Sequence, residues 1–119
     1  MYIASYKQLT VWQKAIELVK ILYRVTDSLP RHELYCLSSQ MRRAAISIPS
    51  NIAEGQQRKN LKEYLQFLRI SYGSAAELET QIIIAKDLYP STEFFAIESL
   101  LDEIQKMLNT IIHKLEAKS

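Results

Sequence analysis

QMRRAAISIPSNIAEG, residues 40–55, is the stretch of sequence that decides the fold. Its apolar residues recur at spacings of three and four, which places them on one face of an α-helix: Met41, Ala44, Ala45, Ile48 and Ile52. The tandem pair Arg42 and Arg43 points away from the centre of that face. The stretch therefore predicts a core helix that carries a basic pair beside its apolar face.

Pro49 falls inside this helical pattern. Proline has no N–H to donate to the carbonyl of Ala45, and its ring crowds that carbonyl. We therefore expect a kink or local unwinding between Ala45 and Pro49. Three flanking polar side chains could satisfy the freed backbone groups: Ser47, Ser50 and Asn51. Gly55 stands where the C′ residue of a helix would, and we expect the helix to stop there.

The composition of the chain favours long helices. The 119 residues suffice for one domain with a real core, and we take residues 1–119 as that domain. Only two glycines and three prolines accompany 48% hydrophobic residues, so the chain has few breakers for many short strands.

Helical periodicity continues on both sides of the opening stretch. It predicts helices over roughly 9–29, 33–54, 61–88 and 92–116, preceded by a short arm at 1–8. We expect Asn60 to cap the third helix in a capping box with Glu63, and Ser91 or Thr92 to cap the fourth. Short connections then favour an all-α fold, an up-down-up-down antiparallel four-helix bundle. Its core should unite Trp12, Leu68 and Ile104, with Trp12 as an anchor near the start of the first helix.

The third helix carries more apolar surface than one small bundle needs. Small residues over 71–76 would let a neighbouring helix approach closely, which gives Gly73 a packing reason. One helix face cannot bury Ile82, Ile83 and Ile84 together, so the helix is covered on two sides or one isoleucine meets a partner subunit. The tyrosines at 64, 72 and 89 add to this surface. We expect a homo-oligomer.

The residues argue against catalysis and against a metal or another cofactor. His32 and His113 have no histidine or cysteine partners at metal-ligand spacing, and two glycines cannot build a phosphate loop. The lone Cys36 lies in an apolar stretch and is interpreted as a buried structural thiol. It also fits a reducing compartment. With no signal-peptide pattern and no membrane-length apolar run, we expect a cytoplasmic protein that does not enter membranes.

Basic residues gather in the first half of the sequence. Residues 1–60 hold nine bases and four acids, a net charge of +5, whereas residues 61–119 hold six bases and nine acids, a net charge of −3. The residues that could contact phosphates of RNA or DNA are Arg42, Arg43, Arg58, Lys59, Lys62 and Arg69. Three of them, Arg58, Lys59 and Lys62, could cluster where the second helix turns into the third.

Several blocks of the sequence resemble one family. They are LTVWQKAIEL at 9–18, the spacing of Pro30, Glu33, Tyr35 and Leu37, SSQMRRAAISIPSNIAEG at 38–55, and SYGSAAELETQI at 71–82. They resemble the bacterial four-helix-bundle proteins linked to intervening sequences in 23S ribosomal RNA genes. The resemblance implies an up-and-down bundle, commonly a ring-like pentamer. It extends to the accessory variability protein of diversity-generating retroelements, a basic pentamer that binds nucleic acid and a reverse transcriptase. Unlike most members, this chain has Gln56 and Gln57 after the Glu–Gly pair, and its fourth helix is acidic.

Two interpretations of function remain open. In the first, the protein is a non-enzymatic accessory oligomer that binds nucleic acid through the six basic residues named above. In the second, it is a structural or adaptor protein whose oligomer surface binds another protein, and the arginines form ion pairs. The two differ in whether the arginines share one solvent-facing surface or pair with acids such as Glu54, Glu77 and Glu79.

Overall fold

Four long helices occupy most of the chain in the computed structural model, which describes residues 5–119. They are α1 (Thr10–Thr26), α2 (Leu37–Gln57), α3 (Leu61–Leu88) and α4 (Phe95–Glu116). Single turns of 3-10 helix, η1 (Tyr6–Gln8) and η2 (Arg31–Glu33), precede α1 and α2. The described residues contain no strand, so the all-α prediction is confirmed. Of the arm expected at 1–8, residues 1–4 lie outside the described part, and η1 occupies most of the rest.

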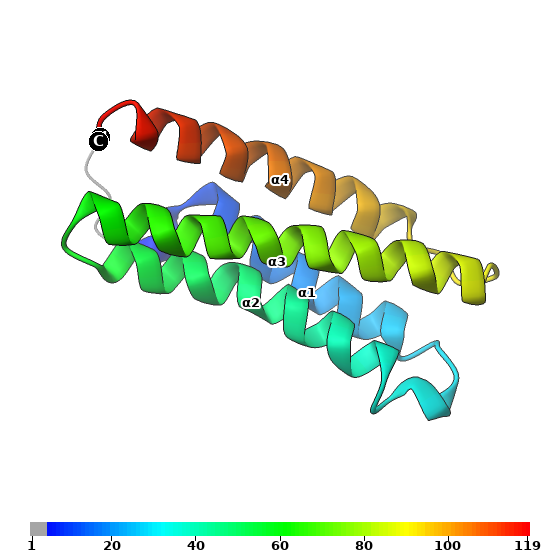
Figure 1. Ribbon diagram of the computed structural model, residues 1–119. Coiled ribbons are helices and arrows are strands. Elements are labelled where there is room, and N and C mark those ends of the chain that lie inside the picture. The colour runs from blue at the N-terminus through cyan, green and yellow to red at the C-terminus, as the bar shows by residue number, and fades with distance from the viewer. Residues whose placement is uncertain (1–4) are drawn as a thin grey trace.

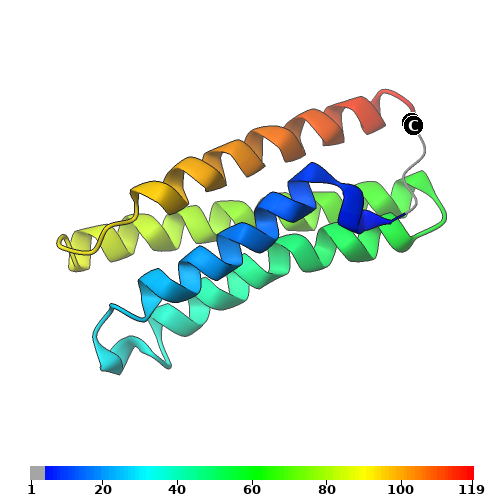
Figure 2. The same ribbon diagram turned by 180° about the vertical axis from the view of Figure 1, so that it is seen from behind.

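The helices alternate in direction along a bundle of 45 × 20 × 20 Å (Figure 1). Each contacts two neighbours: α1 packs on α2 and α4, and α3 packs on the same two. No contact of comparable extent joins the diagonal pairs among the described residues. The predicted up-down-up-down arrangement is therefore confirmed. Seen from behind, η1 lies beside the end where α2 turns into α3 (Figure 2).

One apolar core runs the length of the bundle, as the periodicity predicts. Leu68 and Ile104 are fully buried in it, and Trp12 packs against it from the edge of α1. Trp12 also meets Tyr6 of η1 edge to face, with ring centroids 5.3 Å apart. Of the isoleucine run on α3, only Ile82 is buried, whereas Ile83 and Ile84 are 56% and 46% exposed.

Three helix boundaries differ from the rough predictions by three or four residues, each for a local reason. α1 ends at Thr26 rather than near 29, and the buried Thr26 hydroxyl donates back to the carbonyl of Leu22. α2 begins at Leu37 rather than at 33, because η2 takes up residues 31–33 and the Glu33 carboxylate accepts from the Leu37 amide. α4 begins at 95, with neither Ser91 nor Thr92 as its cap. Its first amide instead donates to the Glu93 carboxylate, 2.7 Å away.

α2 runs without interruption through Pro49, so the expected local unwinding is wrong. Pro49 is buried, and the flanking residues are tied to α3. The Ser71 hydroxyl, fully buried on α3, donates to the carbonyl of Ile48 at 2.9 Å, and the Ser47 and Ser74 hydroxyls lie 2.7 Å apart. The Asn51 amide donates to the carbonyl of Ser47 rather than to that of Ala45. Contacts with α3 thus hold the helix across a residue that would weaken it in isolation.

The two glycines have roles opposite to those expected. Gly55 does not end α2, which continues to Gln57, and neither glycine has a positive φ. A Cβ on Gly55 would lie 2.7 Å from the Cβ of Phe67 and 3.1 Å from the Tyr64 ring, so Gly55 permits the close approach of α3. Gly73 is exposed with nothing within 4 Å of such a Cβ, so no neighbour within the described chain explains it.

The predicted cap of α3 is confirmed. The Glu63 amide donates to the Asn60 side-chain oxygen at 2.8 Å. The Glu63 carboxylate in turn accepts a hydrogen bond from the Asn60 side-chain amide at 2.5 Å. In the usual capping box it would accept from the backbone N–H of the cap residue instead. This double contact fixes the start of α3 directly after the turn.

A carboxylate contact ties η2 to the end of α3 and should make stability depend on pH. The Tyr89 hydroxyl donates to Glu33, and this hydrogen bond is the main cause that holds the pKa of Glu33 below its usual 4.5. A depressed pKa means that the contact stabilises the fold above about pH 4.5 and loses this effect as pH falls through the folded-state value. We predict that Tyr89→Phe lowers the free energy of unfolding at pH 7 more than at pH 3.

Urea unfolding of the Tyr89→Phe variant and the unmodified protein at the two pH values measures this difference. Tyr35→Phe is the matched control, because Tyr35 is 88% exposed and its hydroxyl has no hydrogen bond within the described residues. An equal loss from Tyr89→Phe at both pH values would show that Glu33 has no part in it.

Candidate nucleic-acid interface

The turn between α2 and α3 gathers three of the predicted basic residues. α2 ends at Gln57, and Arg58 is extended, its amide donating to the carbonyl of Gly55 at 3.0 Å. Lys59 follows in the turn, and Lys62 lies in the first turn of α3. All three residues therefore lie at or directly beside this turn, where we expected them to cluster.

Arg58 is the ordered member of the cluster. Its guanidinium pairs with Glu54 at 2.9 Å and lies 3.8 Å from Glu63, and it stacks over the Phe67 ring 4.8 Å from the centroid. Lys59 and Lys62 are exposed and form no ion pair within the described residues. Two of the three cations therefore face solvent unpaired, and the third is oriented by an aromatic ring.

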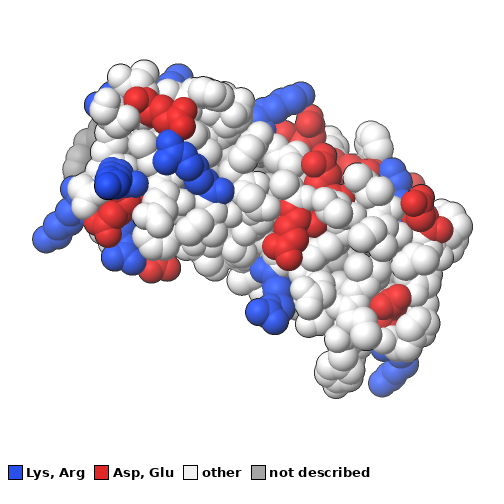
Figure 3. Space-filling model, viewed as in Figure 1, with Lys and Arg blue, Asp and Glu red and all other residues white. Residues whose placement is uncertain are grey.

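Antiparallel packing brings further bases to the same end of the bundle. We define the basic end as the region around the end of α2, the start of α3, the end of α4 and η1. Seven bases lie there: Lys7, Arg58, Lys59, Lys62, Arg69, Lys114 and Lys118. Against them stand Glu54, Glu63 and Glu116, so its net charge is +4, and the other eight bases and ten acids leave −2 for the remainder. On the face shown in Figure 3, basic side chains gather around this end with a few acidic ones among them, and acidic side chains predominate over the opposite half, where some basic ones also lie.

Arg69 belongs to the basic end but is paired. Its guanidinium donates to the Glu116 carboxylate at 2.6 Å and joins α3 to the end of α4. This hydrogen bond is the main cause that lowers the pKa of Glu116. Both side chains are about half exposed. Such exposed pairs contribute little to stability, so a phosphate could replace Glu116 as the partner of Arg69.

Arg42 and Arg43 lie apart from the cluster of Arg58, Lys59 and Lys62. Along α2 they are separated from Arg58 by about 24 Å, taking 1.5 Å per residue. Arg42 is largely buried: its Nε donates to Thr26 and its Nη2 to Asp27, both at 2.9 Å, and its guanidinium lies over the Tyr23 ring. Arg43 is exposed, forms no ion pair within the described residues, and lies beside Glu77 of α3. The six predicted residues therefore do not form one surface.

The contacts of Arg42 should stabilise the α1–α2 packing. We predict that Arg42→Ala lowers the free energy of unfolding by about 1–2 kcal/mol, since a charged hydrogen-bonding group with two partners is lost. Arg43→Ala, the adjacent and exposed control, should change it by less than about 0.5 kcal/mol. Chemical denaturation of both variants measures the difference. Equal losses would contradict the separate roles that the structure gives to the two arginines.

Other chemistry in the described residues is sparse. Residues 5–119 hold no group of three or more histidine, cysteine or acidic side chains that could hold a metal ion. Cys36 is exposed, so its interpretation as a buried thiol is wrong: the chain there is a loop entering α2, not part of the helix. None of the helices in the described part is long and apolar enough to span a membrane.

Sequence reasoning missed the contributions of Lys114 and Lys118. Both lie within residues 61–119, whose net charge is negative, so a comparison of net charge between the two halves of the sequence did not single them out. The signal that could have found them is the helix order, because the fourth helix of an up-down-up-down bundle ends where the third begins. The net charge of this protein is thus positive at the basic end of the bundle and negative over the remainder.

These features define a class: an antiparallel four-helix bundle with one basic end. Within it, the chain belongs to the family of 23S rRNA-intervening sequence proteins, whose model matches residues 7–110. No curated protein matches the sequence. The crystal structure of a protein of unknown function from the S23 ribosomal protein family, from Bacteroides thetaiotaomicron VPI-5482, has a similar fold. It superimposes with a TM-score of 0.78 at 24% identity, over 87% of this chain and 98% of that chain.

Proposed function

We propose that this protein is a non-enzymatic accessory oligomer that binds RNA or DNA through phosphates at its basic end. The observation that carries the proposal is the net charge of +4 gathered there, with Lys59 and Lys62 exposed and unpaired among the described residues. Arg58 and Arg69 complete the interface. Arginine offers phosphate a bidentate partner and lysine a point charge. Arg42, held between α1 and α2, acts in the fold, and Arg43 lies outside this interface.

Binding of this kind should not read base sequence. The described residues present helix ends and one short turn at the basic end, with no unpartnered helix or ribbon shaped for a groove. The acids Glu54, Glu63 and Glu116 already neutralise part of the charge through exposed ion pairs. Phosphates would compete with these acids, so one chain should bind weakly. The family description, which names 23S rRNA intervening sequences, supports RNA among the ligands. The free, exposed thiol of Cys36 supports action in the cytoplasm.

Self-association would raise the affinity by presenting several basic ends to one nucleic acid. Exposed apolar side chains on α3 support it: Ile70, Ile83, Ile84 and Leu88 are each 45% to 58% exposed. The resemblance noted from the sequence favours five subunits.

We predict a mass by light scattering of several times the 13.8 kDa of one chain. A double variant, Ile83→Glu with Ile84→Glu, should reduce that mass, because it places charge on the surface to be buried. A single-chain mass for the unmodified protein would contradict the oligomer.

A mobility-shift titration at about 50 mM salt tests the proposed function, because phosphate contacts are strongest at low salt. Single-stranded RNA, structured RNA and duplex DNA serve as probes. We expect shifts with little sequence preference that weaken steeply as salt is raised. Absence of binding to all three probes at tens of micromolar protein would remove this proposal.

The second candidate function is that of an adaptor for another protein. It is favoured by two aromatic side chains far from the basic end: Tyr35, before α2, and Phe95, at the start of α4, are 88% and 72% exposed. Aromatic residues are enriched in protein interfaces. Replacing both with serine should leave nucleic-acid binding unchanged and abolish capture of a protein partner.

A further inference from the structure

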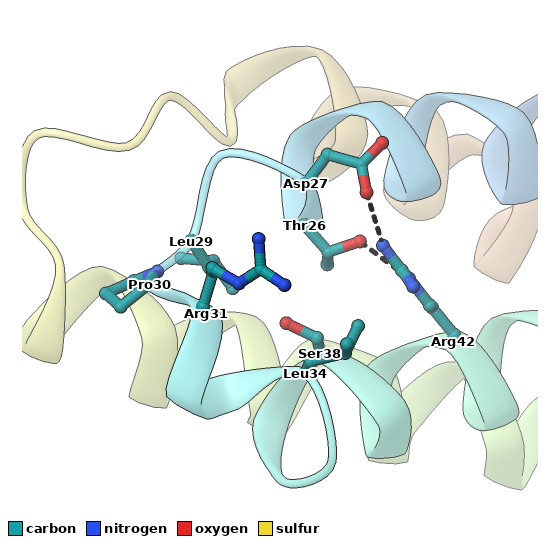
Figure 4. Close-up of a pocket in the computed structure, with 8 residues that line it drawn as sticks. All are labelled: Thr26, Asp27, Leu29, Pro30, Arg31, Leu34, Ser38 and Arg42. Carbon is teal, nitrogen blue, oxygen red and sulfur yellow. Dashed lines mark hydrogen bonds and ion pairs between the residues drawn. The ribbon is translucent and has the colours of Figure 1, made fainter.

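A pocket of about 260 Å³ lies at the end of the bundle opposite the basic end (Figure 4). It is enclosed by the end of α1, the connection that contains η2, and the start of α2. Its lining has an apolar part and a polar part. Leu29, Pro30 and Leu34 form an apolar part, and the polar part comprises Thr26, Asp27, Arg31, Ser38 and Arg42.

Two guanidinium groups enter this pocket from opposite sides. Figure 4 shows Arg31 reaching in from η2 and Arg42 from α2. Arg42 already donates to Thr26 and Asp27. Arg31 has no ion pair or hydrogen bond from its side chain within the described residues. Two cations facing each other across a cavity repel unless an anion lies between them.

Ser38 supplies a hydroxyl without a partner. The residue is only 2% exposed, and its side chain forms no hydrogen bond within the described part of the chain. In Figure 4 its oxygen is directed into the pocket, toward Arg31. The Ser38 oxygen is open to the pocket rather than sealed in the core, so a ligand bound there can serve as its partner. Ser38 also stands in the first turn of α2, where the helix dipole favours negative charge.

The charges in the pocket select the kind of anion. Arg31 and Arg42 contribute two positive charges, and Asp27 contributes one negative charge. The sum of +1 matches a monoanion such as a carboxylate. The second charge of a phosphate monoester would lie unpaired near Asp27. The apolar part formed by Leu29, Pro30 and Leu34 suits a short aliphatic body rather than a polar one.

We propose that this pocket binds a small aliphatic carboxylic acid in its ionised form. Arg31 and Ser38 donate to the carboxylate oxygens, Arg42 supplies the facing positive charge, and Leu29, Pro30 and Leu34 cover the carbon chain. The site is separate from the basic end and does not depend on the function proposed for it.

Saturation-transfer NMR with sodium 4-methylpentanoate and the full-length protein tests the proposal at constant ionic strength. The experiment observes the ligand, so it works for any size of assembly. We expect transfer to the ligand's methyl protons from the apolar part of the pocket. Affinity in the millimolar range, about 4 kcal/mol of binding free energy, suffices for detection. The matched control ligand is 4-methylpentanamide, which keeps the shape and lacks the charge, and it should bind at least about tenfold more weakly.

Three variants sharpen the test while leaving Arg42 itself in place. Arg31→Gln should weaken binding about tenfold, since Arg31 is exposed and its loss leaves the fold intact. Asp27→Asn should strengthen binding several-fold by removing the competing carboxylate. Replacement of Lys59 at the basic end should change nothing. Equal binding of the amide, indifference to Arg31→Gln, stronger competition by inorganic phosphate than by the carboxylate, or no saturation transfer would each overturn the proposal.

Discussion

A protein in which Arg58, Lys59 and Lys62 are all replaced by alanine is expected to lose about a hundredfold or more in affinity for single-stranded RNA at low salt. Each cation that contacts a phosphate contributes about 0.7 to the slope of log affinity against log salt on single strands. Removal of three cations per chain should therefore flatten this slope as well as lower the affinity. In an oligomer the losses at each basic end multiply, because the ends bind one strand together. The helix content should stay the same, since all three side chains lie on the surface.

A matched variant separates this site from net charge. Lys20→Ala, Arg24→Ala and Lys106→Ala remove the same residue types, and hence the same charge, from exposed positions away from the basic end. The match extends to ion pairing: Lys106 pairs with Asp102 four residues away at 2.9 Å, as Arg58 does with Glu54. We expect this control to bind within about threefold of the unmodified protein, since charges beyond a Debye length contribute little. Equal losses in the two variants would mean that overall charge, rather than the basic end, governs binding.

Opposite changes in stability are expected when alanine replaces each of the two glycines. In Gly55→Ala the new methyl would lie 2.7 Å from the Cβ of Phe67, which belongs to the rigid base of that side chain, so α2 and α3 must separate. Overpacking of this kind costs about 1–3 kcal/mol, and the better helix propensity of alanine returns about 1 kcal/mol of it. We therefore expect a net loss of up to about 2 kcal/mol and a melting temperature lower by several degrees.

Gly73→Ala is the matched control, because the same methyl there meets nothing within 4 Å in the described chain. It should stabilise the helix by about 0.5–1 kcal/mol. Thermal unfolding of both variants at one protein concentration measures the pair. Stabilisation by Gly55→Ala would refute the close α2–α3 approach. Destabilisation by Gly73→Ala, with a fall in oligomer mass, would place Gly73 in a subunit contact, as its position in the small-residue stretch suggested.

The fold was predictable because helical periodicity, the scarcity of glycine and proline, and one strong helix cap all indicated long helices joined by short connections. The start of α3 was predicted correctly, since Asn60 and Glu63 carry a local signal that does not depend on tertiary contacts. Pro49 and Gly55 were misread for the opposite reason. Each looks like a helix breaker locally, but packing against α3 overrides that tendency, through the Ser71 hydroxyl in one case and the closeness of the Phe67 Cβ in the other.

The candidate site was predictable only in part. Adjacency in sequence and one turn of chain sufficed to bring Arg58, Lys59 and Lys62 together. Arg42 is held against α1 by Thr26 and Asp27, which lie sixteen and fifteen residues earlier, and no sequence period reveals such a pairing. The link between Arg69 and Glu116 spans 47 residues and likewise follows from the packing of α3 against α4.

The central claim, that nucleic acid binds at the basic end, is tested most directly by locating bound RNA on the protein. Photo-crosslinking to a single-stranded RNA that carries 4-thiouridine, followed by peptide mapping, gives that location. Binding at the basic end predicts crosslinks within residues 54–69 and 113–119, lost when salt is raised and lost in the triple variant at Arg58, Lys59 and Lys62. Crosslinks confined to the opposite end, around residues 24–43 or 86–106, or none at saturating protein, would contradict it.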